Sequence, residues 1–491
     1  MVVAIALVFL AINIYIGFLV SKWIRSSTDF LVAGREVKGF VQFCSFAAIN
    51  FAGSNLVAIP AFVVTVGFWP AVWWNIGLGL IYMLLAFTSM KLLRRSGVYT
   101  INEWIEIRFG KGARRAIAVG QFVGLIFGGA ANIAGVGLAM GPLVGWNFAT
   151  TAAVTSVAFT IYMLMAGAWG NTVNDTLQFL FGVALYVAVL LFALVTFGLP
   201  VNNYDPARMF AFPGGAPLLG LGEAPTYLYG IFGWFLFSFT AQHYYVKCAA
   251  VRSERAVVLG TFGAGVFAIV WAFMVGLIGL YAIHLTPGGI PANQALGAFA
   301  KFTAQLPTLL AALIVLGYLA AALSTIVAVL QANASIGARD IYQGIFKPGA
   351  TPREMLLPSR IATLITAIVM FAASFVPGGP APLLALMAVF MGVSAILFVV
   401  GTSWRRATPM AGTVAAFAGI IVGLLWAFVL PPSMTTFAGA KVFAGYPAAL
   451  VTLVLAVGLS FVTAPKYYGR PEWRFGRERL AVSPEPAAGG D

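Results

Sequence analysis

Long apolar stretches, each about the length of a membrane-spanning helix, dominate the hydrophobic pattern of this 491-residue chain. A helix needs roughly 20 mostly apolar residues to cross a bilayer, and thirteen stretches approach or exceed that length. They are residues 2–22, 38–66, 69–92, 115–142, 147–169, 172–199, 225–251, 256–284, 304–338, 358–377, 381–402, 409–430 and 443–464. The pattern predicts an all-α polytopic membrane protein with about 13 transmembrane helices.

The apolar stretches follow one another without a polar segment long enough for a separate domain. Residues 1–464 are therefore expected to form a single transmembrane domain embedded in the lipid bilayer. The remaining residues, 465–491, contain Pro, Gly and Arg and are expected to form a cytoplasmic tail.

The composition excludes several classes of protein. Residues of the set AVILMFWYC make up 61% of the chain and charged residues only 9%, against about 25% charged residues in a soluble protein. The net charge of +14 would suggest nucleic acid in a soluble protein, but cytoplasmic loops of membrane proteins also collect Lys and Arg. The sequence has no GxxxxGK[ST] motif for a nucleotide and no nucleophile–base or metal-ligand spacing. We therefore expect neither an enzyme nor a partner of nucleic acid or nucleotides.

The basic residues fall on one side of the predicted membrane. If the N-terminus is outside, all of the 28 Lys and Arg residues except Arg208, Lys301 and Lys441 lie in inside segments. Cytoplasmic loops carry the excess of Lys and Arg. We therefore expect an external N-terminus and a cytoplasmic C-terminus in the cell membrane.

The second apolar stretch is interrupted by polar and small residues. Asn50, Gly53, Ser54 and Asn55 lie close together in its middle, and such residues are poor helix formers. A broken helix survives in a membrane only where it lines protein or a water-filled cavity. This favours an unwound segment that exposes carbonyls to a cation and side chains to a substrate, although small polar residues also pack between helices.

A second interruption follows about five helices later. Phe239, Thr240, Gln242 and His243 alternate polar and aromatic groups at membrane depth, with the basic Lys247 shortly after them. An interfacial aromatic belt is the alternative interpretation. Two interrupted helices at corresponding places in two halves are typical of an inverted-repeat transporter.

Two further features carry chemistry that the pattern alone leaves open. Ala321, Ser324 and Thr325 share one helix face and could present hard oxygens to a small cation. Hydroxyls that bond back to their own helix are the more common case. Asp175 is the single acid within a predicted span, so it is either a possible coupling residue or a partner of a helix N-terminus.

Several short motifs occur in a fixed order along the chain. They are residues 29–35, 99–104, 108–110, 167–169, 175–178, 243–244, 249–250, 321–325 and 339–342. In this order and spacing, the chain resembles the sodium:solute symporter family, whose members carry proline, pantothenate, sialic acid and galactose. The resemblance covers residues from about 5 to 465.

The resemblance implies a leucine-transporter-like fold. In that fold, five plus five helices form an inverted repeat, here spanning residues 38–402. Residues 2–22 would be a peripheral helix, and residues 409–464 would contribute two extra helices.

The resemblance also implies a sodium site. Its ligands would be the carbonyls of Ala48, Phe51 and Ala321 and the hydroxyls of Ser324 and Thr325. Members that bind a second sodium carry further hydroxyls where this chain has Val327 and Ala328. One sodium ion is therefore expected.

The expected substrate is a small, partly apolar organic solute. A sugar is disfavoured because Ser54, Asn55 and Trp74 stand where sugar-transporting members carry acidic and amide side chains. The candidate substrate-binding residues are Asn50, Gly53, Ser54, Asn55, Trp73, Trp74, Phe239, Thr240, Gln242 and His243.

The expected function is secondary active transport, in which sodium entry drives solute uptake by alternating access in a monomer. A proton-coupled carrier that uses His243 or Asp175 is one alternative. A membrane sensor without net transport is the other.

Overall fold

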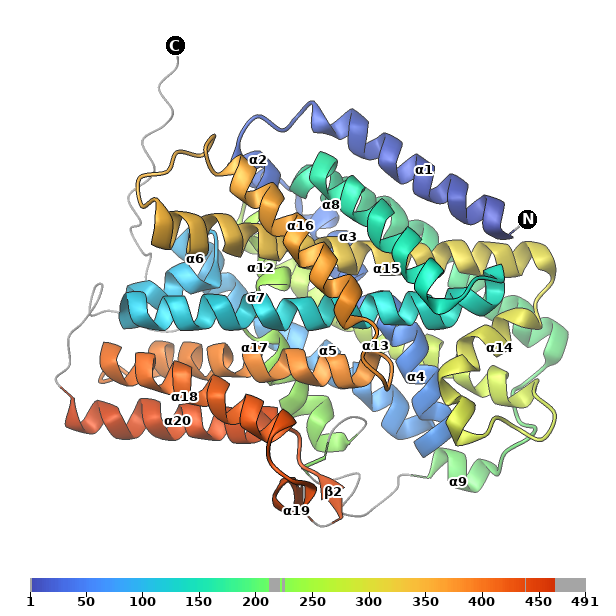
Figure 1. The fold of residues 1–491 in the computed structure, drawn as a ribbon. Helices are drawn as coiled ribbons and strands as arrows, with labels where there is room; N and C mark the ends of the chain where they lie inside the picture. The colour runs from blue at the N-terminus through green and yellow to red at the C-terminus, as the bar shows by residue number, and fades with distance from the viewer. Residues whose placement is uncertain (1, 212–220, 223–225, 438, 464–491) are drawn as a thin grey trace.

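A computed structural model describes residues 2–211, 221–222, 226–437 and 439–463, and these residues are almost entirely helical. The long helices pack together as a bundle, with α1 along one edge and α18 and α20 along the opposite edge (Figure 1). The expected tail at 465–491 lies outside the described residues.

The helices carry the labels of Figure 1, and η marks short 3-10 or π-helical segments. Their bounds are α1 Val2–Ser21, α2 Ser27–Val32, η1 Ala33–Arg35, α3 Gly39–Asn50, α4 Gly53–Val66, α5 Phe68–Phe87, α6 Ser89–Ser96, α7 Ile101–Val144, α8 Phe148–Phe197, α9 Pro206–Phe210, η2 Tyr229–Gly233, α11 Trp234–Ser238, α12 Gln242–Ala249, α13 Glu254–His284, η3 Ala292–Gly297, α14 Ala298–Ala304, α15 Thr308–Ser335, η4 Ile336–Phe346, α16 Leu356–Ala373, α17 Pro380–Ser403, α18 Pro409–Phe428, α19 Pro432–Thr435 and α20 Gly445–Val462. Two short antiparallel strands, β1 Thr436–Phe437 and β2 Ala440–Lys441, precede α20.

The described residues contain ten helices that are long and apolar enough to span a membrane, or eleven when the bent pair α3 and α4 is counted as one span. The predicted number of 13 is not confirmed. The predicted spans 147–169 and 172–199 both lie in α8, which is kinked at Gly167 (φ 50°, ψ −151°). A straight helix of that length would measure about 75 Å, more than twice the roughly 30 Å of a bilayer core. The kink therefore divides α8 into two segments.

Burial along the helices separates the centre of the bundle from its rim. In α15 and the start of η4, every residue from 317 to 338 is buried. In α16, α18 and α20, only about a third of the apolar window is buried, and exposed Ile and Leu side chains cover the remainder. A helix that is apolar on all sides and buried lies inside a bundle, so α15 is the central helix against which the others pack.

One arginine of α7 binds the turn between α17 and α18. The guanidinium of Arg108 in α7 donates to the carbonyls of Gly401 at 3.0 Å, Ala407 at 2.8 Å and Trp404 at 3.0 Å. These carbonyls belong to the end of α17 and the turn before α18, where the last carbonyls of a helix have no partner within it. Arg108 thus fixes α17 and α18 against α7.

Candidate functional site

The first predicted interruption is a break between α3 and α4. Helix α3 ends at Asn50, α4 begins at Gly53, and the two helices are bent by 48°. Gly53 permits a close approach to α15, because a Cβ atom at this position would lie 3.0 Å from the Cβ of Ala322. The break therefore lies directly against the central helix.

Side chains from other helices satisfy the backbone that the break releases. Tyr318 of α15 donates its hydroxyl to the carbonyl of Gly53 at 2.8 Å. The N–H of Ser54 donates to Oδ1 of Asn132 in α7 at 3.2 Å. A backbone group without a partner at membrane depth would cost several kcal/mol, so these side chains make the unwound conformation stable.

The second predicted interruption is also a break, between the end of α11 at Ser238 and the start of α12 at Gln242. Gln121 of α7 donates to the carbonyl of Thr240 at 3.1 Å and to Oγ of Ser394 at 2.9 Å. The hydroxyl of Thr240 in turn donates to Oγ of Ser394 at 3.0 Å. The loop between α11 and α12 is thus held by polar side chains of α7 and α17.

Oxygen atoms of α3 and α15 meet at the first break. Oγ of Ser324 lies 2.8 Å from the carbonyl oxygen of Ala48 and 2.9 Å from that of Ala321. Oγ1 of Thr325 lies 3.1 Å from the carbonyl oxygen of Ile49 and 3.3 Å from that of Ala321. The structure therefore brings together four of the five expected sodium ligands, and it adds the carbonyl of Ile49.

The fifth expected ligand, Phe51, contacts a different part of the bundle. Its ring packs against Trp271 and Tyr186, with ring centroids 4.5 and 5.5 Å away, and its N–H donates to the carbonyl of Ala47 at 3.1 Å. Among the described residues, no hydroxyl of α15 lies within hydrogen-bond distance of the Phe51 carbonyl.

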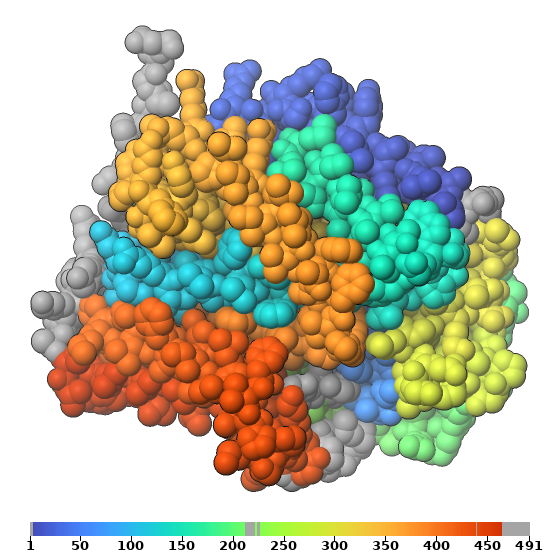
Figure 2. Space-filling view, in the orientation of Figure 1, coloured from blue at the N-terminus to red at the C-terminus, as the bar shows by residue number. Residues whose placement is uncertain are grey.

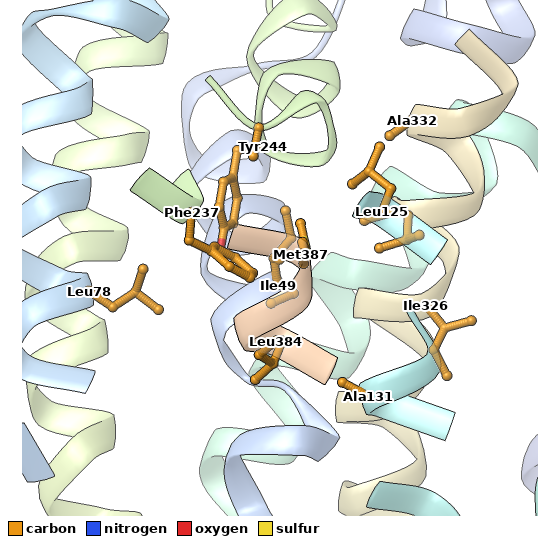
Figure 3. Packing of buried hydrophobic residues seen from close by; sticks show 14 of the residues in the cluster. Ile49, Leu78, Leu125, Ala131, Phe237, Tyr244, Ile326, Ala332, Leu384 and Met387 are labelled. Carbon is orange, nitrogen blue, oxygen red and sulfur yellow. The ribbon is translucent and has the colours of Figure 1, made fainter. Parts of the chain in front are cut away.

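A cavity lies between the two breaks and contains about 30 Å³ of free space, enough for about one or two water molecules. Four of the expected substrate-binding residues line it, namely Asn50, Ser54, Asn55 and His243. Figure 3 shows apolar side chains that line the same cavity, namely Ile49, Leu78, Phe237, Tyr244, Leu384 and Met387. Within the part of the chain that the structure describes, no charged side chain lines this cavity.

An amide cluster forms the polar wall of the cavity. Nδ2 of Asn55 lies 3.2 Å from the carbonyl oxygen of Asn50 and 3.3 Å from Oδ1 of Asn75 in α5. Nδ2 of Asn50 and Nδ1 of His243 are buried and have no hydrogen-bond partner among the described residues. Buried polar groups in proteins are almost always paired, so these two groups are available to a bound molecule.

The other expected substrate-binding residues lie around the cavity and do not line it. Trp74 stacks on Tyr229 of η2, with ring centroids 5.2 Å apart, and it lies one helical turn from Leu78. Its neighbour Trp73 donates Nε1 to the carbonyl of Tyr227 at 2.9 Å. Gly53 packs against α15 as described above, and Phe239 packs against Phe235 and Phe398.

Gln242 and Thr240 do not line the cavity either: the hydroxyl of Thr240 bonds to Ser394, and the amide of Gln242 bonds to backbone. Gln242 donates Nε2 to the carbonyl of Tyr99 at 3.0 Å and accepts the N–H of Ile101 at 3.0 Å. Its amide is therefore satisfied by the segment before α7. The sequence could not show this, because the two segments are about 140 residues apart.

A buried ion pair lies below the breaks, at Asp175. Nζ of Lys247 in α12 lies 2.5 Å from Oδ2 of Asp175 in α8, and Oγ of Ser45 in α3 lies 2.6 Å from the same oxygen. The two charged side chains are only 2% and 1% exposed. The charge pattern counts Lys247 among the basic residues of the inside segments, and in the structure it is a buried partner of Asp175.

An aromatic ring between two guanidinium groups lies near the same end of the bundle. The ring of Tyr99 has Arg35 at 4.3 Å and Arg339 at 4.0 Å from its centroid. Arg339 is also paired with Glu103 at 2.9 Å. A cation within about 6 Å of a ring face is attracted by the negative charge of that face. Both guanidinium groups are therefore held on Tyr99, and the cluster joins the segments before α3, before α7 and after α15.

Several residues of this site were not among the candidates predicted from the sequence. Asn75 and Asn132 lie within long apolar stretches, and neither has a polar residue three or four positions away. Both reach the first break from helices that are distant in sequence. An intramembrane amide is a candidate by its polarity alone, but only the tertiary structure shows which amides meet.

Comparison with known proteins finds a matching family and similar solved structures. A model of the sodium:solute symporter family matches residues 30–423. The chain is similar to a Na⁺-coupled sialic acid symporter solved in a substrate-bound outward-open state, with a TM-score of 0.77, 19% identity, and coverage of 94% of this chain and 98% of that chain. It is also similar to Mhp1, a nucleobase-cation-symport-1 family transporter solved closed with bromovinylhydantoin bound, with a TM-score of 0.59, 15% identity, and coverage of 89% and 96%.

These likenesses identify the fold as leucine-transporter-like. The matched family region contains both breaks, the oxygen cluster on α15 and the buried ion pair. The protein is an integral membrane transporter, not an enzyme, and it couples sodium to the uptake of a small solute by alternating access. The chain belongs to the sodium:solute symporter family.

Proposed function

We propose that the coupling sodium ion binds between α3 and α15. Its ligands are the hydroxyls of Ser324 and Thr325 and the carbonyls of Ala48, Ile49 and Ala321. The observation that supports this assignment is the set of 2.8–3.3 Å distances among these oxygens. A small hard cation prefers several oxygen ligands. Ile49 takes the place of Phe51 because its carbonyl is the one near Thr325.

We propose a stoichiometry of one sodium ion per transport cycle. Asp175 is the acid that would attract a second cation near α15, but Lys247 already supplies a positive charge at 2.5 Å. A second sodium ion would have to displace this ammonium group or bind against its charge. The pair Val327 and Ala328 offers no additional hydroxyl on the helix face below Thr325.

We propose that the solute binds to the residues that line the cavity between the breaks, and that it is uncharged, partly apolar and able to accept hydrogen bonds. Asn50 and His243 supply unpaired polar groups beside the amide cluster, and the opposite lining includes apolar side chains such as Leu78, Leu384 and Met387. A net charge in this cavity would lack a counter-charge, which is costly in a low dielectric. Because Asn50 directly follows Ile49, solute and sodium would bind to adjacent residues of one break.

The sodium assignment predicts the phenotype of Ser324→Ala combined with Thr325→Val. The double variant keeps the helix and nearly the same side-chain volume but removes two of the five oxygens. We expect the sodium concentration for half-maximal uptake to rise at least about tenfold, since each lost polar partner costs about 1–3 kcal/mol. Sodium-dependent solute uptake into proteoliposomes measures this.

Ser335→Ala is the matched control. Ser335 is a buried hydroxyl of the same helix that bonds back to the carbonyl of Gln331 at 3.0 Å, and its loss should leave sodium affinity unchanged. Unchanged sodium affinity in the double variant would falsify the proposed site. Uptake driven by a pH gradient at zero sodium would instead support a proton-coupled carrier.

The solute assignment predicts that Asn55→Leu weakens solute binding while sodium affinity stays nearly unchanged. The substitution removes the amide that joins Asn50 to Asn75. The solute is first identified as the compound that gives the largest sodium-dependent rise in melting temperature. We then expect its Kd for the variant to rise at least about tenfold.

Asn13→Leu is the control for that experiment. Asn13 and Asn55 are equally buried, at 3% exposure each, but Asn13 contacts Asn174 and Gln178 at the α1–α8 interface. This control should lower the melting temperature without changing the Kd of the solute. If the Asn55→Leu variant binds the solute as tightly as the parent, the amide cluster is not part of the binding site.

We propose that the ion pair of Asp175 and Lys247 holds the cytoplasmic end of the pathway closed. The pair joins α8 to α12, and Ser45 joins α3 to the same carboxylate. Asp175→Asn leaves the buried ammonium without a counter-charge, at a cost of about 3–5 kcal/mol. We expect a lower melting temperature and a large loss of uptake in this variant.

The reporter for opening is Cys248, which is a buried free thiol next to Lys247 in the chain. In a Cys44→Ser background, Asp175→Asn combined with Lys247→Met should regain most of the melting temperature, because neither charge then remains buried alone. Alkylation of Cys248 should nevertheless stay faster than in the parent. An alkylation rate equal to that of the parent would show that the pair does not close the pathway.

We propose that the N-terminus is external and the C-terminus cytoplasmic, in the cell membrane. The basic residues before α3, around α6 and before α16 support this orientation through the positive-inside rule. A protease added to intact cells should leave a C-terminal tag uncut and should cut it once the membrane is permeabilised. Cleavage of the tag in intact cells would show that the C-terminus is external and would contradict the proposed orientation.

A further inference from the structure

An apolar groove lies on the outer surface between the first segment of α8 and α16. These helices are neighbours on the face shown in Figure 2, with α8 in teal and α16 in orange. The groove contains about 320 Å³ of free space. Its lining residues are Ala153, Ser156, Val157, Thr160, Ile161, Leu164, Leu364, Ala367, Ile368 and Phe371. The small side chains among them keep the groove hollow.

The groove continues toward the end of α1. A second hollow of about 530 Å³ shares Leu164 and Leu364 with the first and is also lined by Ser21 and Arg360. From Arg360 to Phe371, α16 advances about 16 Å, which is about half of the roughly 30 Å bilayer core. The groove therefore has the depth of one leaflet, with an arginine at its polar end.

The mouth of the groove is basic. The N–H of Ser27 donates to the carbonyl of Pro352 at 3.2 Å, which joins the segment after α1 to the segment before α16. These two segments carry Lys22, Arg25 and Arg353.

The acidic side chains near the mouth already have hydrogen-bond or ion-pair partners. Glu354 is paired with Lys347 at 2.5 Å, and Asp29 accepts hydrogen bonds from the start of α2. Among the residues that the structure describes, no carboxylate lies within ion-pair distance of Arg360. Arg360 is exposed, so its guanidinium is available to an anion at the membrane surface.

We propose that this groove binds one anionic phospholipid, with an acyl chain between α8 and α16 and the phosphate at Arg360. The apolar wall matches an acyl chain, and its length matches one leaflet. The basic mouth selects an anionic headgroup over a zwitterionic one, as basic pockets between membrane helices do on the cytoplasmic side. The site is separate from the sodium and solute sites and does not depend on their assignment.

The test is native mass spectrometry of the purified full chain with added palmitoyl-oleoyl phosphatidylglycerol or the phosphatidylcholine with the same chains. We expect one phosphatidylglycerol molecule to bind at least fivefold more tightly than phosphatidylcholine. R360Q should remove this preference, because it removes the charge at the mouth. V157W should weaken both lipids at least fivefold, because the new ring fills the groove from its open side.

Two variants provide matched controls. R405Q removes another exposed arginine, located after α17, and V195W adds a ring to an exposed position near the end of α8. Both should bind the two lipids like the parent, and all four variants should keep the parent's melting temperature. Equal binding of the two lipids, an equal loss in R405Q, or a dimer that V157W disrupts would overturn the proposal.

Discussion

The need to satisfy broken backbone inside the membrane is the constraint on which this structure depends. Between Asn50 and Gly53 the helix ends and restarts, and its free groups cannot turn to water. Tyr318 and Asn132 supply the missing partners from α15 and α7. The central helix therefore packs against the break because it satisfies that backbone, and this contact also brings Ser324 and Thr325 to the carbonyls of α3.

The same constraint explains why polar residues cluster at two levels of an otherwise apolar bundle. At the second break, Gln121 and Ser394 hold the loop through Thr240. Below both breaks, Lys247 and Asp175 lie in the interior, where an unpaired charge would be very costly. Each polar group is stable only while the helix that carries its partner stays in place. Movement of one broken helix therefore changes the energy of contacts on several others.

Both breaks could be predicted from sequence because they arise from local composition. Asn50, Gly53, Ser54 and Asn55 disfavour a helix wherever they occur together, and the structure has its first break at these residues. The apolar spans were predicted for the same local reason. The predicted number of 13 is not confirmed, because the kink at Gly167 lies within one long helix and α12 is too short to count as a span.

The partners across the bundle could not be predicted from sequence. Gln242 was expected to meet the solute because it is polar and lies beside a break, yet it holds Tyr99 and Ile101. Lys247 was counted only among the basic residues on the inside, yet it is buried, and its partner Asp175 makes that burial tolerable. Each depends on a residue at least 70 positions away. Such pairing is a property of the tertiary structure, and no local pattern of polarity indicates it.

The arrangement of the first break also explains how ion and solute could be coupled. The hydroxyls of Ser324 and Thr325 reach the carbonyls of Ala48 and Ile49 only while α3 lies against α15. An ion bound among these oxygens would therefore stabilise that arrangement relative to any state in which the helices separate. A solute at Asn50, the next residue, would be stabilised by the same arrangement. Because linkage is reciprocal, the factor by which sodium raises solute affinity equals the factor by which the solute raises sodium affinity.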